Sequence, residues 1–108
     1  MDISVEDASD HIVVRLTESR LDAAVAGEFK DRARPHFAVA GPDLVLDLGA
    51  VEFLDSSGLG AVIALRKALP ADRRMRLRGL TPNVDRVFRL TRMDRIFDII
   101  RPDPGATA

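Results

Sequence analysis

The order in which strand and helix patterns follow one another constrains the fold of this chain more than any other feature. Strand-like apolar patterns occur at 3–5, 12–16, 44–48 and 74–78, and helical spacing occurs at 23–34, 57–69 and 82–91. A last apolar segment, 96–100, predicts a short strand or a docked segment. Alternation of strand, helix and strand requires parallel pairing with right-handed crossovers. Turn residues at 7–10 predict an antiparallel hairpin. We therefore expect an α/β domain: a small mixed β-sheet with an N-terminal antiparallel hairpin, parallel βαβ crossovers and three main helices.

Local signals set the expected bounds of the first helix and of the domain. Asp22 fits as the N-cap of the first helix. Pro35 lacks an N–H, so we expect it to kink or end that helix, with regular structure from Ala23 to Arg34 and a bent continuation toward Val39. We expect one domain over residues 1–101 and a mobile C-terminal tail over 102–108.

Composition excludes several classes of function. The chain has no Cys, which removes disulfides, thiolate catalysis and Cys-based metal sites. Its two histidines, His11 and His36, fall in different predicted elements and lack a metal-ligand spacing. No acid–base constellation suggests an enzyme, and we expect no cofactor. No apolar run is long enough to span a membrane, and no signal sequence is present, so we expect a cytoplasmic protein without membrane insertion.

Charge is distributed unevenly although the net charge is only −1. Residues 1–58 hold 12 acids and 5 bases, whereas residues 59–108 hold 5 acids and 11 bases. This asymmetry fits either a partner surface or two halves that neutralise one another, and we favour the second interpretation. Arg74, Arg76 and Arg78 alternate with apolar residues, as on a solvated sheet face. Without Trp or Tyr the chain has few groups that stack on bases, so we expect no nucleic-acid partner.

The stretch from Asp55 to Gly60 contains the main candidate functional residues. Asp and Ser are good N-caps, but Gly58 and Gly60 each cost about 1 kcal/mol relative to alanine inside a helix. Bare backbone is useful where another molecule approaches closely, and a helix N-terminus favours a phosphate. A plain cap followed by flexible residues is the competing interpretation. No nucleophile elbow or phosphate-binding loop occurs, so the serines are better read as groups acted upon.

These residues, together with Val45–Leu48 and Val51–Leu54 before them, resemble the signature of the STAS domain and in particular bacterial anti-sigma factor antagonists. The resemblance covers about residues 3–101. It implies partner switching: the unmodified protein binds an anti-sigma factor that is also a serine kinase of the histidine-kinase-like ATPase type. That kinase then phosphorylates Ser56, and a serine phosphatase removes the phosphate.

The resemblance also implies which residues contact the partner: Asp22, Asp55, Ser56, Ser57, Gly58, Leu59 and Gly60. Ser57 is the competing phosphate acceptor or a helix cap, and the spacing of Leu59 slightly favours a core position. Where the family commonly has Gly-x-Leu-Asp, this chain has Glu18–Asp22, which keeps Leu-Asp, lacks the Gly and has one extra residue. That turn is part of the partner-facing rim in the family, so the departure bears on which partner is bound.

Two further classes of function compete with the antagonist. A STAS accessory or scaffold module of a transporter or sensory complex would act without phosphorylation and would not need an acceptor serine. The retained Ser56 therefore favours the antagonist. An enzyme or nucleic-acid-binding protein built on the arginine-rich half has no supporting motif.

Overall fold

The computed structural model describes residues 1–101, and the predicted tail at 102–108 lies outside the described residues. The strands are β1 (Ile3–Asp7), β2 (His11–Leu16), β3 (Arg20–Leu21), β4 (Asp43–Asp47), β5 (Phe53–Leu54), β6 (Met75–Arg78) and β7 (Asp98–Ile100). The helices are α1 (Ala26–Phe37), α2 (Ser56–Ala68) and α3 (Pro82–Leu90), followed by the 3₁₀ turn η1 (Met93–Arg95).

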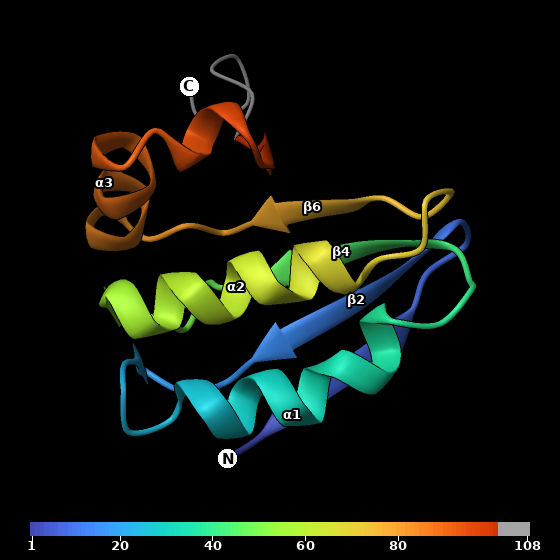
Figure 1. Cartoon of the computed structure of the whole chain (residues 1–108), viewed down its shortest axis with the longest axis horizontal. Helices are drawn as coiled ribbons and strands as arrows, with labels where there is room; N and C mark the ends of the chain where they lie inside the picture. The colour runs from blue at the N-terminus through green and yellow to red at the C-terminus, as the bar shows by residue number, and fades with distance from the viewer. Residues whose placement is uncertain (102–108) are drawn as a thin grey trace.

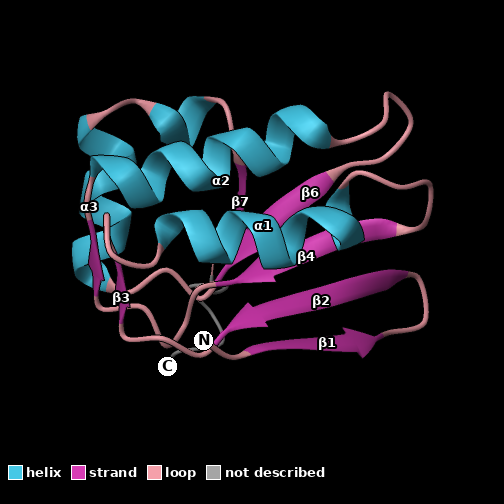
Figure 2. Cartoon of the chain, turned by 60° about the horizontal axis from the view of Figure 1, so that its bottom comes forward, coloured by secondary structure: helices cyan, strands magenta, loops and turns pink. Residues whose placement is uncertain are grey.

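The main sheet has five strands in the order β1-β2-β4-β6-β7 (Figure 1). Strands β1 and β2 pair antiparallel, whereas the β2–β4, β4–β6 and β6–β7 pairs are parallel. Because successive crossovers move in one direction across the sheet, right-handed connections place their helices on the same face. Figure 2 shows α1 and α2 side by side over that face. The predicted fold class is confirmed.

The core lies between this face and the two helices. Leu44, Leu46 and Leu48 alternate along β4 and its end, and all three are fully buried. Phe29 and Phe37 of α1 are also fully buried, which follows from their helical spacing on one face. This packing fixes α2 relative to the sheet and thereby fixes the position at which α2 begins.

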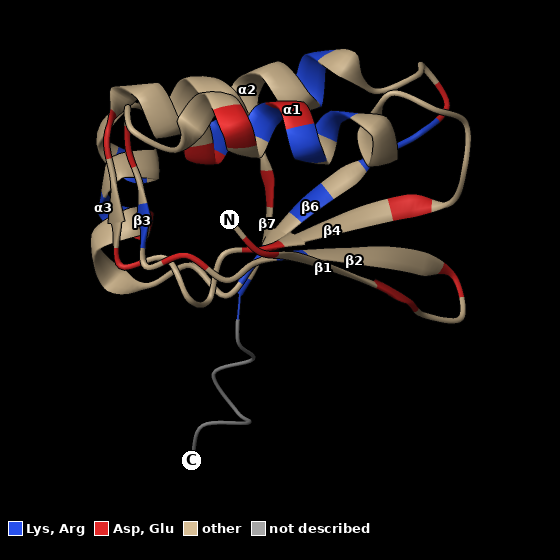
Figure 3. Ribbon diagram, turned by 90° about the horizontal axis from the view of Figure 1, so that it is seen from below, with Lys and Arg blue, Asp and Glu red and all other residues tan. Residues whose placement is uncertain are grey.

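Acidic and basic residues both occur along the strands of the sheet (Figure 3), and those that alternate with the buried leucines lie on its opposite face. Arg15, Asp47 and Arg78 stand in one row of the register. Asp47 Oδ2 lies 2.9 Å from Arg78 Nη2 and 3.5 Å from Arg15 Nε. Because Asp47 and Arg78 belong to the acidic and the basic half of the chain, this row supports mutual neutralisation of the two halves.

Asp47 makes stability depend on pH. Burial alone would raise the pKa of its carboxyl, but the Gly49 amide and the Arg78 guanidinium hold that pKa below the ordinary 3.8. A lowered folded-state pKa gives stability that is complete above the unfolded value and is lost as the pH falls through the folded value. We expect Asp47→Asn to cost about 1–2 kcal/mol at neutral pH, and this cost should shrink below about pH 4.

Urea unfolding followed by circular dichroism, repeated across the acid range, measures this effect. Asp72→Asn is the matched control, because Asp72 is exposed and makes no side-chain hydrogen bond within residues 1–101. The control should stay within about 0.5 kcal/mol of wild type. A cost of Asp47→Asn that is the same at about pH 2 as at neutral pH would contradict the assignment.

Two sequence-based predictions about α1 are wrong. The helix begins at Ala26 rather than Ala23, because the carbonyl of Asp22 accepts hydrogen bonds from the amides of Val25 and Ala26 and closes a turn there. Asp22 caps this turn instead of the helix: its Oδ1 accepts from the Ala24 amide at 3.1 Å. Regular helix also continues past Pro35 to Phe37.

The C-terminal turn of α1 is held from outside the helix, which explains why Pro35 does not end it. The Arg73 side chain, just before β6, donates from Nε to the Pro42 carbonyl at 2.6 Å and from Nη1 to the Val39 carbonyl at 2.9 Å. Nη1 also bonds the carbonyl of His36. A cation at a helix C-terminus is favourable in itself. The sequence pattern gives no signal for this contact.

Candidate functional site

Asp55 builds the site at the start of α2. Its Oδ1 accepts a hydrogen bond from the Gly58 amide at 3.0 Å, so Asp55 is the helix cap among the Asp and Ser residues that the sequence offers. Its Oδ2 accepts from the Ala23 amide at 3.2 Å, in the turn that precedes α1. One half-buried carboxylate therefore joins two segments that are far apart in the sequence.

Ser56 and Ser57 are the first two residues of α2, and both are exposed. Within the described part of the chain, neither hydroxyl makes a hydrogen bond to another protein group. The first amides of a helix have no intrahelical partner, so this end of α2 is also polarised to favour negative charge. The site thus presents two accessible hydroxyls on a fixed backbone.

The two glycines of the motif have different surroundings. Gly58 is buried, and a Cβ at this position would lie 2.1 Å from the carbonyl oxygen of Leu21. The sequence analysis attributes the absence of a side chain at Gly58 to close approach by another molecule. In the structure, strand β3 of the same chain packs against Gly58 instead. A Cβ at Gly60 would meet nothing within 4 Å, and Gly60 is exposed. Leu59 is 8% exposed and belongs to the core, as its spacing favours.

Asp22 lies in the turn that Asp55 fastens to α2. Its Oδ2 accepts a hydrogen bond from Arg20 Nε at 3.1 Å. Strand β3 pairs in parallel with β5, so that Arg20 stands opposite Phe53 and Leu21 opposite Leu54. The structure therefore brings the Asp22 turn and the Ser56 motif together, while the contacts of all these residues with a partner remain predictions.

A shallow groove of about 180 Å³ runs between α1 and α2 beside Ser57. Ser57, Gly60 and Ala64 line it on the α2 side, and Gly27 and Lys30 line it on the α1 side. Its small side chains leave the helix backbones open near the serines.

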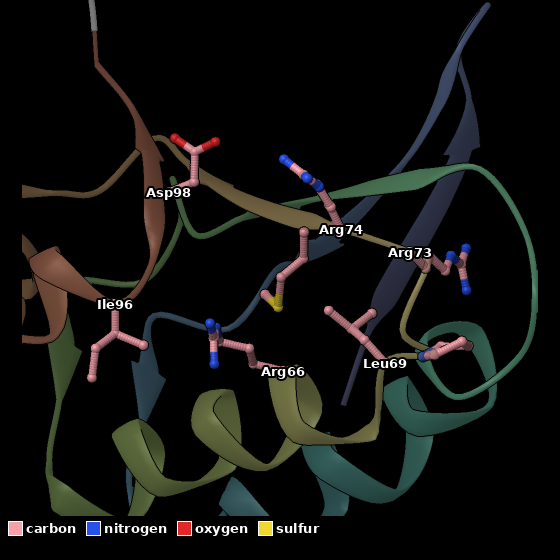
Figure 4. Close-up of a pocket in the computed structure, with 8 residues that line it drawn as sticks. Arg66, Leu69, Arg73, Arg74, Ile96 and Asp98 are labelled. Atoms are coloured by element: carbon pink, nitrogen blue, oxygen red, sulfur yellow. The ribbon is translucent and has the colours of Figure 1, made fainter.

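A larger hollow, about 410 Å³, lies elsewhere in the molecule. Figure 4 shows the side chains around it: Arg66 and Leu69 at the end of α2, Arg74 just before β6, and Ile96 and Asp98. It lies at the amino ends of the parallel strands, whereas α2 begins beyond the carboxyl end of β4. Its lining provides one carboxylate and no His, Ser or Cys, so it offers no acid–base pair for catalysis.

Residues 1–101 contain neither a cluster of metal-binding side chains nor a helix able to span a membrane. No group of three or more His, Cys, Asp or Glu residues is placed to hold a metal ion. Among the helices in the same range, none combines the length and the apolar character needed to cross a membrane.

Solved structures share this arrangement of a mixed sheet with helices over one face. A crystal structure of an anti-sigma factor antagonist from Mycobacterium paratuberculosis has a TM-score of 0.84 and 28% identity, covering 98% of this chain and 90% of that one. An anti-sigma factor antagonist (STAS) domain protein from Planctomyces limnophilus has a TM-score of 0.84 at 21% identity, covering 98% and 95%. The Bacillus cell fate determinant SpoIIAA in its phosphorylated form has a TM-score of 0.61 at 21% identity, covering 98% and 97%. The fold is thus that of anti-sigma factor antagonists.

The family follows from the sequence itself. The family model described as "Mlab, STAS domain" matches residues 3–101, so the chain belongs to the STAS domain family. The match covers both the Asp22 turn and the Ser56 motif.

Proposed function

We propose that this chain is a bacterial cytoplasmic anti-sigma factor antagonist controlled by phosphorylation of Ser56. Its unmodified form binds an anti-sigma factor that is a serine kinase of the histidine-kinase-like ATPase type. Phosphorylation of Ser56 releases that partner, and a serine phosphatase restores binding. The observation that carries the proposal is the exposed Ser56 hydroxyl at the first position of α2, directly after the Asp55 cap. The 28% identity to the Mycobacterium paratuberculosis antagonist over nearly the whole chain supports it.

The physical basis of the switch is a difference in solvation. A phosphoserine adds about 1.5 to 2 negative charges at neutral pH. In the free protein, water surrounds Ser56 and the N-terminus of α2 favours an anion, so the fold tolerates the group. In a packed interface the same charge loses its water and lies beside the carboxylate of Asp55. Phosphorylation therefore acts on the complex and leaves the domain folded.

Two substitutions at Ser56 test the proposal. We expect Ser56→Asp to weaken binding of the anti-sigma kinase about thirty-fold, which corresponds to about 2 kcal/mol for a desolvated charge. Ser56→Ala should bind within about threefold of wild type, because exposed substitutions change little. The kinase is the ATPase captured from the organism's own extract, then purified and titrated in a calorimeter.

A phosphorylation assay identifies the acceptor. With ATP and the purified kinase, wild type and Ser57→Ala should each gain one phosphate, whereas Ser56→Ala should gain none. Mass spectrometry of the intact protein and of its peptides gives the result. Phosphate on Ser57, or equal affinity of wild type and Ser56→Asp, would count against the switch. Equal affinity is the outcome expected of a scaffold module that works without phosphorylation.

A further inference from the structure

The turn that departs from the family pattern is fixed rigidly against the acceptor motif. The Ser19 carbonyl accepts hydrogen bonds from the amides of Glu52 at 2.7 Å and Phe53 at 3.2 Å. Strand pairing then places Arg20 opposite Phe53. Side chains on this turn are therefore presented by a fixed backbone, not by a free loop.

Arg20 is held from two sides. Its guanidinium carbon lies 4.4 Å from the centroid of the Phe53 ring, and its Nε donates to Asp22 Oδ2 at 3.1 Å. Within residues 1–101, its two terminal nitrogens make no hydrogen bond. The Arg20 side chain is 62% exposed and Phe53 is 42% exposed, so the stacked pair faces solvent. The N–H groups of these two nitrogens are therefore available to donate hydrogen bonds to a partner that binds this surface.

The pair lies within reach of any protein that covers Ser56. Phe53 and Ser56 are three residues apart, so their Cα atoms are separated by no more than about 11 Å. A standard interface buries about 800 Å² on each partner, which is ample to include both. An interface centred on the Ser56 hydroxyl is therefore large enough to cover Arg20 and Phe53 as well.

The charges around Arg20 indicate the kind of partner group that this side chain attracts. Residues 17–25 and 49–60, the two segments that hold β3 and β5, carry four acids and one base; they are Glu18, Asp22, Glu52, Asp55 and Arg20. Arg20 is the one position there that attracts a negative group, and its planar fork matches a carboxylate. Arg and aromatic residues are enriched at the energetic centres of interfaces, and a preorganised side chain loses less entropy on binding.

We propose that Arg20, stacked on Phe53 and hydrogen-bonded to Asp22, selects the partner by pairing with a carboxylate on the anti-sigma kinase. This inference rests on the proposed function, because it names the contact through which the antagonist recognises that kinase. Arg20 lies in the segment that replaces the family's Gly-x-Leu-Asp turn, and it gives this chain its own partner preference.

Calorimetric titration with the same purified anti-sigma kinase tests the pairing. We expect Arg20→Ala to weaken binding at least tenfold, or about 1.4 kcal/mol. Arg20→Glu should weaken it further, and Arg20→Lys should fall between Ala and wild type because Lys lacks the fork. Phe53→Leu should also weaken binding, since it removes the ring that orients Arg20. Arg76→Ala is the matched control, an exposed arginine on the helix-free sheet face, and should bind within twofold of wild type.

A charge reversal completes the test. Replacing the partner's facing acid with Lys should restore the affinity lost in Arg20→Glu, and circular dichroism should show every variant folded. Arg20→Ala within twofold of wild type, while Ser56→Asp still weakens binding about thirty-fold, would overturn the pairing and leave the switch standing. Weak binding by Arg20→Ala with equal affinity of Ser56→Asp and wild type would overturn the switch alone. Failure of wild type to bind any anti-sigma kinase would overturn both.

Discussion

Gly58→Ala should destabilise the protein by about 3 kcal/mol or more, at the upper end of overpacking costs, although it usually favours helices. The added Cβ would lie 2.1 Å from the Leu21 carbonyl oxygen and 2.9 Å from the Leu21 carbonyl carbon. Backbone cannot rotate away as a flexible side chain does. The same oxygen accepts a hydrogen bond from the Asp55 amide at 3.4 Å, and Leu21 is paired with Leu54. Relief of the clash would therefore separate α2 from β3.

Gly60→Ala is the matched control, because it makes the same change two residues further along the same helix. Nothing lies within 4 Å of a Cβ there, so the substitution should stabilise the protein by about 1 kcal/mol. The chain has no Trp or Tyr, so urea unfolding is followed by far-ultraviolet circular dichroism. Gly58→Ala within about 1 kcal/mol of wild type would contradict the close packing against Leu21.

The sheet and its helices were predictable because their signals are local and repeat. Leu44, Leu46 and Leu48 alternate inward, and Phe29 and Phe37 recur at helical spacing. Strands β3 and β5 have no counterpart among the strand-like segments that the sequence predicts. Two residues are too few to show a period, so these strands exist only through their pairing with each other.

In the candidate site, too, local features were predictable and features that depend on distant residues were not. The start of α2 at the Asp-Ser-Ser stretch was predictable because helix capping is a local property of neighbouring residues. The burial of Gly58 depends on Leu21, and the orientation of Arg20 depends on Phe53, so neither follows from a local pattern. The altered turn around Arg20 was the one sequence signal for that contact. The end of α1 is a further case. The local rule predicts that Pro35 ends the helix, but hydrogen bonds from Arg73, which is distant in the sequence, hold the last turn.

Arg73→Met should cost about 3 kcal/mol, because it leaves carbonyls in the last turn of α1 and in the loop that follows without their donor. Arg73 is 4% exposed, and its guanidinium serves the carbonyls of Pro42, Val39 and His36. Methionine retains an apolar stem of similar length, so the loss reports on the hydrogen bonds and the charge more than on packing. Burial lowers the pKa of the Arg73 guanidinium, but the group stays charged at neutral pH.

Arg73→Lys separates charge from geometry. Lysine keeps the cation near the helix terminus but cannot reach several carbonyls with a planar fork, so about half of the lost stability should return. Arg76→Met, an exposed arginine of β6, should change stability by no more than about 0.5 kcal/mol. Hydrogen exchange should show faster opening of the last turn of α1 in Arg73→Met than elsewhere in the helix, because Pro35 leaves that turn dependent on the outside donor. Uniform exchange along α1, together with an unchanged urea midpoint, would mean that the helix passes Pro35 without help from Arg73.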